Sequence, residues 1–263
     1  MLSVLSAIFK KSARVDQRNR SAFIDQIRGF VIVNMVIYHF CYASVKLYGA
    51  QWAWFRGFAA GAWQEFICCS FLIIAGLCTR FSSNRWKRSL IVGLCAAIIT
   101  IAAYLFNKNQ PIVFGILHCM AVCMLITAAT YKLLDRTNAI VGIAVSIALA
   151  LITWHTTRGY FGFGELSFKL PTALYETNAL FAFGIKSKSF RSVDYFPLFP
   201  YLFVFLAGRF LGAYTEKLPK SLYSVPFDPL AFLGRHSLII YMIHQPIIIA
   251  AIYLFLRLRA LNS

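Results

Sequence analysis

Charged residues are scarce in this 263-residue chain, where they make up 13% of the sequence and only nine are acidic. A soluble domain usually carries about 25% charged residues. Apolar residues make up 60% of the chain and occur in long continuous blocks. Such blocks are typical of segments that cross a lipid bilayer. The composition therefore excludes an ordinary soluble domain and predicts a multi-pass membrane protein.

Two further absences narrow the class. The apolar blocks lack the alternation of apolar and polar residues that marks a transmembrane β-strand. Because only helices and closed barrels satisfy the backbone in lipid, we interpret the blocks as helices. The seven cysteines include no Cys-x-x-Cys pair, and six of them fall inside apolar blocks, where a cysteine packs as a small apolar residue. No metal site is predicted.

Seven apolar blocks are interpreted as membrane spans. They cover about residues 23–43, 64–78, 90–106, 112–134, 139–155, 196–213 and 233–256. The predicted fold is therefore all-α, a polytopic transmembrane bundle of about seven helices. We expect one transmembrane domain over residues 21–257, preceded by a basic segment at 1–20.

A polar stretch at about residues 156–195 interrupts the second half of the chain. Only residues 179–185 within it are continuously apolar, and so short a segment cannot cross a bilayer. We interpret the stretch as a long outer loop with a short interfacial or re-entrant piece. If residues 170–186 did span the membrane, there would be eight helices and every later segment would be inverted.

The net charge of +17 comes mostly from Lys and Arg between the apolar blocks. Up to residue 156, the segments on the side of residues 1–20 carry eleven Lys or Arg, and those on the other side carry three. Since basic residues concentrate in cytoplasmic connections, the N-terminus is predicted to lie in the cytoplasm, with the chain in the cell membrane. No basic face exists outside these connections, so nucleic acid is not an expected partner.

Arg28 and His39 are ionisable residues inside the first span, where such groups are costly and indicate function. They are eleven residues apart, which places them on one helix face about 16 Å from each other. Asp25 can pair with Arg28, and Gly29 leaves room beside it for a ligand or a neighbouring helix. This stripe suits a substrate with a charged head and a reactive end. The alternative is an interfacial Arg–Asp anchor with a structural histidine.

Three more arginines lie near the predicted inner helix ends, as Arg28 does: Arg80, Arg209 and Arg235. Four guanidinium groups at one level could converge on phosphates, which the planar guanidinium binds in a bidentate manner. The alternative is that these side chains extend to lipid phosphates.

Other polar residues fall toward the outer side. His118 is expected near the depth of His39, either as a second functional histidine or as a hydrogen-bonded core residue. His244 is assigned a structural role unless it faces the other histidines. Asp194 either caps the sixth span or lies at the mouth of a pocket, and Glu65 is a similar candidate for the pocket mouth.

Four segments carry a resemblance to a known family: IDQIRGFVIVNMVIYHF (24–40), FGILHCMAV (114–122), DYFPLFPYLFVFLAGRFLG (194–212) and LGRHSLIIYMIHQP (233–246). The chain resembles the bacterial branch of the heparan-α-glucosaminide N-acetyltransferase catalytic-domain family, which is related in pattern to the acyltransferase-3 membrane proteins. The resemblance implies transfer of an acetyl group from cytoplasmic acetyl-CoA to an extracytoplasmic hydroxyl or amine. In the acyltransferase-3 pattern, an arginine and a histidine eleven residues apart on the first helix handle the CoA and the chemistry, and Arg28 and His39 match this spacing.

The sequence departs from the family at one point. The animal enzymes place their catalytic histidine in the outer segment before the second span, and residues 44–65 contain no histidine. The resemblance therefore does not extend to the glucosamine acceptor or to a covalent acetyl-histidine.

These observations predict a membrane-embedded acyltransferase that uses acetyl-CoA and a glycan or another envelope component as acceptor. Arg28, Arg209 and Arg235 would bind the donor phosphates. His39 or His118 would act as general base, a role that suits imidazole near neutral pH. Asp194 and Glu65 would bind the acceptor. The alternative is a transporter or flippase for an anionic or lipid-linked substrate, and the sequence leaves open whether the chain forms a homo-oligomer.

Overall fold

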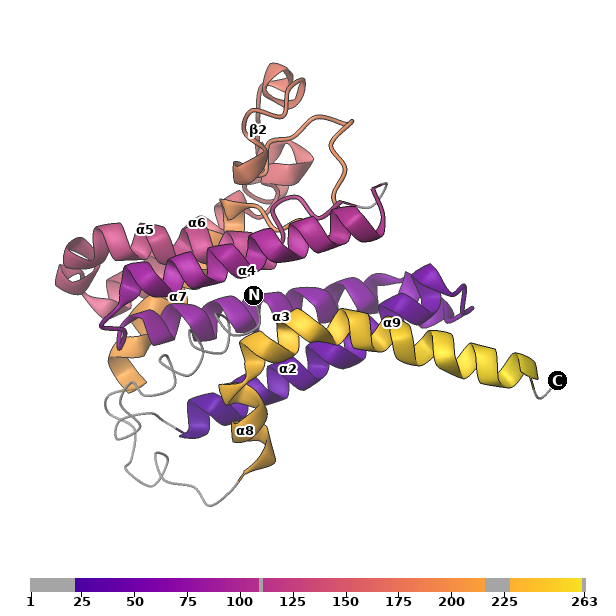
Figure 1. Cartoon of the computed structure of the whole chain (residues 1–263). Coiled ribbons are helices and arrows are strands. Elements are labelled where there is room, and N and C mark those ends of the chain that lie inside the picture. Colours follow the sequence, from indigo (N-terminus) through magenta and orange to yellow (C-terminus); the bar gives the residue numbers. More distant parts are fainter. Residues whose placement is uncertain (1–21, 109–110, 216–227, 262–263) are drawn as a thin grey trace.

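The computed structural model describes residues 22–108, 111–215 and 228–261, so the predicted basic segment at 1–20 lies outside the described residues. Seven of the described helices are long and apolar enough to cross a membrane, which confirms the predicted fold class (Figure 1). These helices are α2 (Ala22–Tyr42), α3 (Phe58–Thr79), α4 (Arg85–Phe106), α5 (Ile116–Arg136), α6 (Ala139–Thr153), α7 (Leu198–Thr215) and α9 (Ser237–Leu261). The first and fifth spans continue through helical turns to Leu47 and Arg158. The chain is a multi-pass membrane protein.

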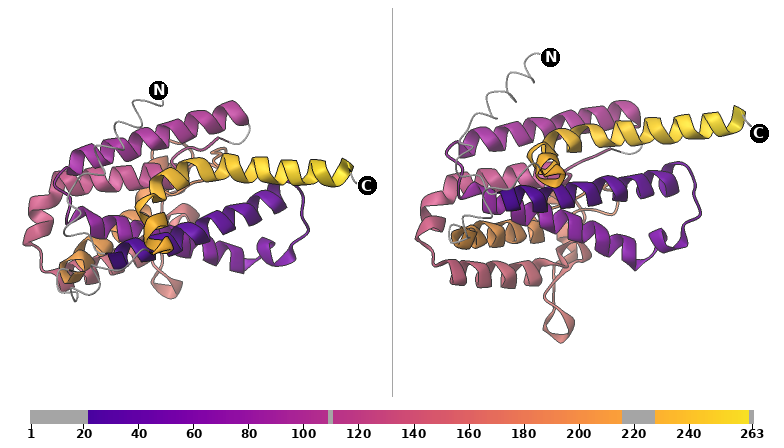
Figure 2. Two further views of the ribbon diagram at one scale, coloured as in Figure 1. Left: turned by 60° about the horizontal axis from the view of Figure 1, so that its bottom comes forward. Right: turned by 90° about the horizontal axis from the view of Figure 1, so that it is seen from below.

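Successive long helices run in alternating directions, so the bundle has two ends (Figures 1 and 2). We call one the arginine end, because Arg28, Arg80, Arg85, Arg88 and Arg209 lie near the helix termini there. We call the other the loop end, because it carries the connection between α6 and α7. The π-helical turn Ala43–Leu47, which extends α2, and the 3₁₀ turn Ala53–Arg56 also lie at the loop end.

The polar stretch between α6 and α7 does not span the membrane. It contains the short strands β1 (Tyr160–Phe161) and β2 (Phe168–Lys169), which pair antiparallel, and four 3₁₀ turns at Thr156–Arg158, Gly164–Leu166, Thr172–Tyr175 and Phe181–Phe183. The predicted short apolar piece forms only the last of these turns. Within the described residues, nothing between 170 and 186 is long enough to cross a bilayer, so the eight-helix alternative is excluded.

The prediction of one continuous last span from residue 233 was wrong. The chain forms a short helix α8 (Pro229–Arg235) and starts α9 at Ser237, with non-helical backbone at His236 between them. Figure 1 shows α8 at a steep angle to α9. Asp228 caps α8 through hydrogen bonds from the N–H groups of Leu230 and Ala231, which fixes the start of a separate helix.

Two pairs of glycines bring helices into backbone contact. A Cβ atom on Gly29 would overlap the backbone of Leu230, and one on Gly234 would overlap the backbone of Asp25, so α2 and α8 cross at these glycines. In the same way, Gly76 and Gly208 allow α3 and α7 to touch. Small residues permit such close packing in membranes, where apolar burial gives little drive for association. The sequence analysis expected a ligand or a neighbouring helix beside Gly29, and the structure places helix α8 there.

Candidate active site

Two cavities open on one face of α3. Gln64, Ile67, Cys68 and Phe71 line the first, and Ala75, Cys78 and Thr79 line the second. These positions recur every three or four residues, which is the spacing of one helix face. Phe71 and Ala75, where the two sets meet, are one turn apart, or about 6 Å along the axis. We call the first the histidine cavity and the second the arginine cavity.

The histidine cavity lies between α2, α3, α5, α9 and the segment that leads into α7. His39 lines it together with Tyr38 from α2, and Tyr241 contributes from α9. The cavity has an empty volume of about 390 Å³, including space open to solvent.

His39 has a second histidine beside it. The ring centroids of His39 and His244 are 4.6 Å apart. Among the described residues, Nδ1 of His39 and Nε2 of His244 are both buried without a hydrogen-bond partner. His244 thus faces His39, which was the condition set for giving it more than a structural role.

Asp194 also lines the histidine cavity. Its carboxylate accepts a hydrogen bond from the N–H of Ile116 at 3.3 Å, at the first turn of α5, where the helix dipole favours a negative charge. Burial raises the pKa of Asp194 to about 6, and the hydrogen bond from Ile116 opposes this rise. Of the two alternatives for Asp194, the cap of its own helix is not observed, because α7 begins only at Leu198.

Two other predicted site residues line neither cavity. Glu65 accepts hydrogen bonds from the hydroxyl of Tyr201, which lies 2.9 Å from each carboxylate oxygen. His118 places Nε2 3.3 Å from Oγ1 of Thr100 and stacks on Phe114. The structure therefore brings together His39, His244 and Asp194 but not His118 or Glu65.

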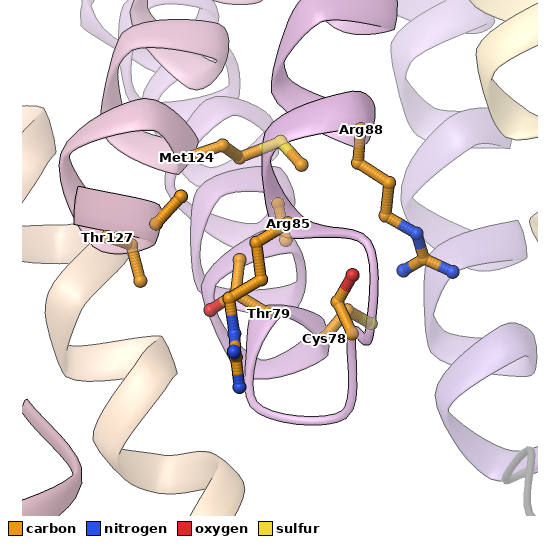
Figure 3. A pocket seen from close by; sticks show the side chains of 9 residues that line it. Cys78, Thr79, Arg85, Arg88, Met124 and Thr127 are labelled. Carbon is orange, nitrogen blue, oxygen red and sulfur yellow. The ribbon is translucent and has the colours of Figure 1, made fainter. Parts of the chain in front are cut away.

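The arginine cavity lies at the junction of α3, α4 and α5. Arg85 and Arg88 line it from the first turn of α4, and Ser82 lines it from the connection before that helix. Figure 3 shows the guanidinium groups of Arg85 and Arg88 on either side of this connection, near Cys78 and Thr79. The hydroxyl of Ser82 and Nε of Arg85 are buried and have no partner among the described residues. These groups can donate hydrogen bonds to an anion.

Arg28 is held next to this cavity by three neighbours. Its Nη2 lies 3.0 Å from Sγ of Cys78, and its Nη1 lies 3.1 Å from Oδ1 of Asp25 and 3.5 Å from the carbonyl oxygen of Gly234. The predicted pairing of Arg28 with Asp25 is present. Arg28 thus connects α2 to α3 and α8 while it adds positive charge beside the cavity.

The other predicted donor ligands lie at the same end without lining the cavity. Arg209 is only 2% exposed and pairs with Asp135, and its Nε and Nη1 have no partner among the described residues. Arg80 and Arg85 are close enough to repel its charge. Arg235 is exposed at the end of α8. The sequence analysis missed Arg85 and Arg88 as site residues, although their spacing of three residues already predicts one helix face.

The fold and the two cavities define a class of membrane protein with a cationic site at one end of a helical bundle and a titratable site toward the other. The family model described as heparan-alpha-glucosaminide N-acetyltransferase, catalytic, matches residues 20–246. The chain therefore belongs to this family of membrane acetyltransferases, and the resemblance seen in four sequence segments is confirmed. Searches of curated proteins and of solved structures gave no significant match.

Proposed function

We propose that this protein transfers an acetyl group from cytoplasmic acetyl-CoA to a hydroxyl or amine that enters from the other side of the membrane. The observation that carries the proposal is the placement of two cavities one helical turn apart on the same face of α3. Acetyl-CoA has phosphates at one end and a reactive thioester at the end of a long arm. The arginine cavity suits the phosphates, and the histidine cavity suits the thioester.

The donor would be held by Arg28, Arg85 and Arg88, with Ser82 donating a further hydrogen bond. Arginine suits this role because its planar guanidinium binds phosphate oxygens in pairs and stays charged at any physiological pH. The basic connections at this end support a cytoplasmic location for it, since such residues concentrate on the cytoplasmic side. Arg209 and Arg235 add positive charge nearby.

The acceptor would enter at the loop end, where Asp194 and Gln64 line the histidine cavity. Tyr38 donates a hydrogen bond to Gln64 at 3.2 Å, which orients the amide. His39 would remove the proton from the acceptor as its oxygen or nitrogen attacks the thioester carbon, a task that suits a neutral imidazole. The carbon–sulfur bond then breaks, and the proton passes to the thiolate of CoA. An envelope glycan is the acceptor class that the family suggests.

Acetyl-CoA binding by the purified protein in nanodiscs is the deciding experiment. We expect saturable binding in isothermal titration calorimetry, lost in Arg85→Ala/Arg88→Ala and kept in the matched variant Lys87→Ala, whose side chain is exposed on the same helix turn. In proteoliposomes, acetyl transfer should need acetyl-CoA on one side and acceptor on the other. Absence of acetyl-CoA binding would overturn the proposal in favour of a transporter or flippase for an anionic or lipid-linked substrate.

A further inference from the structure

His244 is a buried titratable residue that the proposed reaction does not use. It lies in α9, two residues before Pro246, and is 8% exposed. It is not among the residues that line the histidine cavity. Its ring nevertheless packs against His39, which does line the cavity. His244 can therefore act on the reaction through His39, although its ring also packs against Tyr241, which lines the cavity.

The tautomer of His244 follows from its own helix. Its Nδ1 lies 2.6 Å from the carbonyl oxygen of Tyr241. A carbonyl oxygen can only accept a hydrogen bond, so Nδ1 carries the proton and Nε2 of the neutral ring is an acceptor. This Nε2 is buried and has no partner among the described residues. An unsatisfied buried polar atom is costly, so Nε2 of His244 is a candidate to accept a hydrogen bond from a neighbouring donor.

His39 offers the complementary group. Its Nδ1 is also buried without a partner among the described residues, and its ring centroid is 4.6 Å from that of His244. When Nε2 of His39 is the basic atom, Nδ1 of His39 is a donor. Two positive charges on adjacent rings would repel each other, so only one ring of the pair carries an extra proton at a time.

We propose that His244 is a positioning residue that accepts a hydrogen bond from Nδ1–H of His39 through its Nε2. This contact would hold His39 with the lone pair of Nε2 directed to the acceptor, and it would stabilise the imidazolium that forms during transfer. The proton leaves the acceptor O–H or N–H for Nε2 of His39, the new bond to the acetyl carbon forms, the carbon–sulfur bond breaks and the thiolate takes the proton. A base oriented by a third group is a recurring arrangement in nucleophilic catalysis. The role in transfer rests on the proposed function, whereas the hydrogen bond does not.

Replacing His244 by glutamine or by asparagine tests the hydrogen bond, because the two side chains have similar polarity but place the amide oxygen at different positions. Glutamine can place its amide oxygen where Nε2 of histidine lies, and asparagine places its oxygen near the position of Nδ1. We expect His244→Asn to lower kcat roughly 100-fold, within the range of acid–base effects, with the KM for acetyl-CoA unchanged. His244→Gln should recover at least tenfold of that loss. Equal losses in the two variants, or a change confined to KM, would overturn the proposal.

A double variant checks that His244 acts through His39. Residues that work as one unit have non-additive effects, so His39→Ala/His244→Asn should be no slower than His39→Ala alone. Multiplied losses in the double variant would show an independent role for His244 and refute the coupling.

Histidine-selective ¹⁵N NMR without substrate measures the contact itself. We expect the ring nitrogens of His39 to shift in His244→Asn and to return toward the wild-type values in His244→Gln, while the signals of His118 and His155 stay in place. Unchanged His39 signals would overturn the inference. A response of His39 in a protein that neither binds acetyl-CoA nor transfers acetyl groups would instead refute the proposed function and leave the histidine pair standing.

Discussion

The arginine cavity and the histidine cavity share one face of α3 but differ in the groups they present. The first is lined by two arginines, whose charge is permanent at physiological pH, from the first turn of α4. The second is lined mainly by apolar and neutral side chains around His39 and Asp194, whose charges can change. A permanent cation binds an anion, and a titratable pair moves a proton. Under the proposed function, one substrate would be held at one end and would react at the other.

Removing the base should have the largest effect. We expect His39→Ala to lower acetyl transfer about 10²–10⁴-fold, because the acceptor loses its general base. Acetyl-CoA binding should remain, since the arginine cavity is untouched. Transfer in proteoliposomes and calorimetry on the same preparation measure both.

The companion variant His118→Ala tests which of the two histidines proposed from the sequence, His39 or His118, acts as the general base. His118 lies beside Thr100 and away from the cavity, so we expect transfer to stay within about threefold of wild type. A large loss in His118→Ala with an active His39→Ala would reverse the assignment of the base.

Blocking the connection between the cavities should have the next largest effect. Ala75 lies one turn from Phe71, where the two cavities approach each other. Ala75→Phe should lower acetyl transfer at least tenfold. Binding of adenosine 3′,5′-diphosphate, the phosphate-bearing end of the donor, should be kept. The larger side chain itself should lower the stability of the fold by about 1–3 kcal/mol. The control is Ala62→Phe, an exposed position on the same helix. Normal transfer by Ala75→Phe would show that the donor arm does not pass between the cavities.

Weakening the donor site should have a smaller effect. A hydrogen bond to a charged group contributes about 1.5–3 kcal/mol, so Arg88→Ala should raise the KM for acetyl-CoA roughly 10- to 100-fold with kcat nearly unchanged. Steady-state kinetics against acetyl-CoA measure this, with Lys87→Ala as the control. A fall in kcat at constant KM would place Arg88 in the chemistry and break the division between the two ends.

Local sequence pattern predicts the spans and one functional stripe, because both depend on residues close together in the chain. The seven apolar blocks and the helical spacing of Arg28 and His39 belong to this group. The break between α8 and α9 and the approach of His244 to His39 depend on tertiary packing. In particular, α8 packs against α2 at Gly29 and Gly234, where the two backbones touch. These glycines are 205 residues apart in the sequence.

A depth estimate could not decide between the two roles that the sequence left open for His118. Counting residues from a helix end gives a height in the membrane but not the direction in which a side chain points. His118 and His39 were matched by height, and the structure turns His118 toward Thr100 on α4. His244 was found only as a conditional candidate because the sequence does not show which side chains of other helices it faces.

The acceptor side should show the smallest effect, and it depends on pH. Burial disfavours the carboxylate of Asp194 and raises its pKa to about 6, so the group is ionised at pH 7.5 and largely protonated at pH 5. If the carboxylate binds the acceptor, kcat/KM for the acceptor should fall as pH drops through about 6. Asp194→Asn should be severalfold less efficient at pH 7.5 and should lack this fall.

The control for this prediction is Glu165→Gln, which changes an exposed carboxylate on the same loop. Its pH profile should match the wild type. Asp228 cannot produce the fall, because hydrogen bonds from Gln26 and from the backbone lower its pKa, and it stays ionised throughout this window. If Asp194→Asn kept the wild-type profile, Asp194 would not be the titrating group, and its assignment to acceptor binding would be wrong.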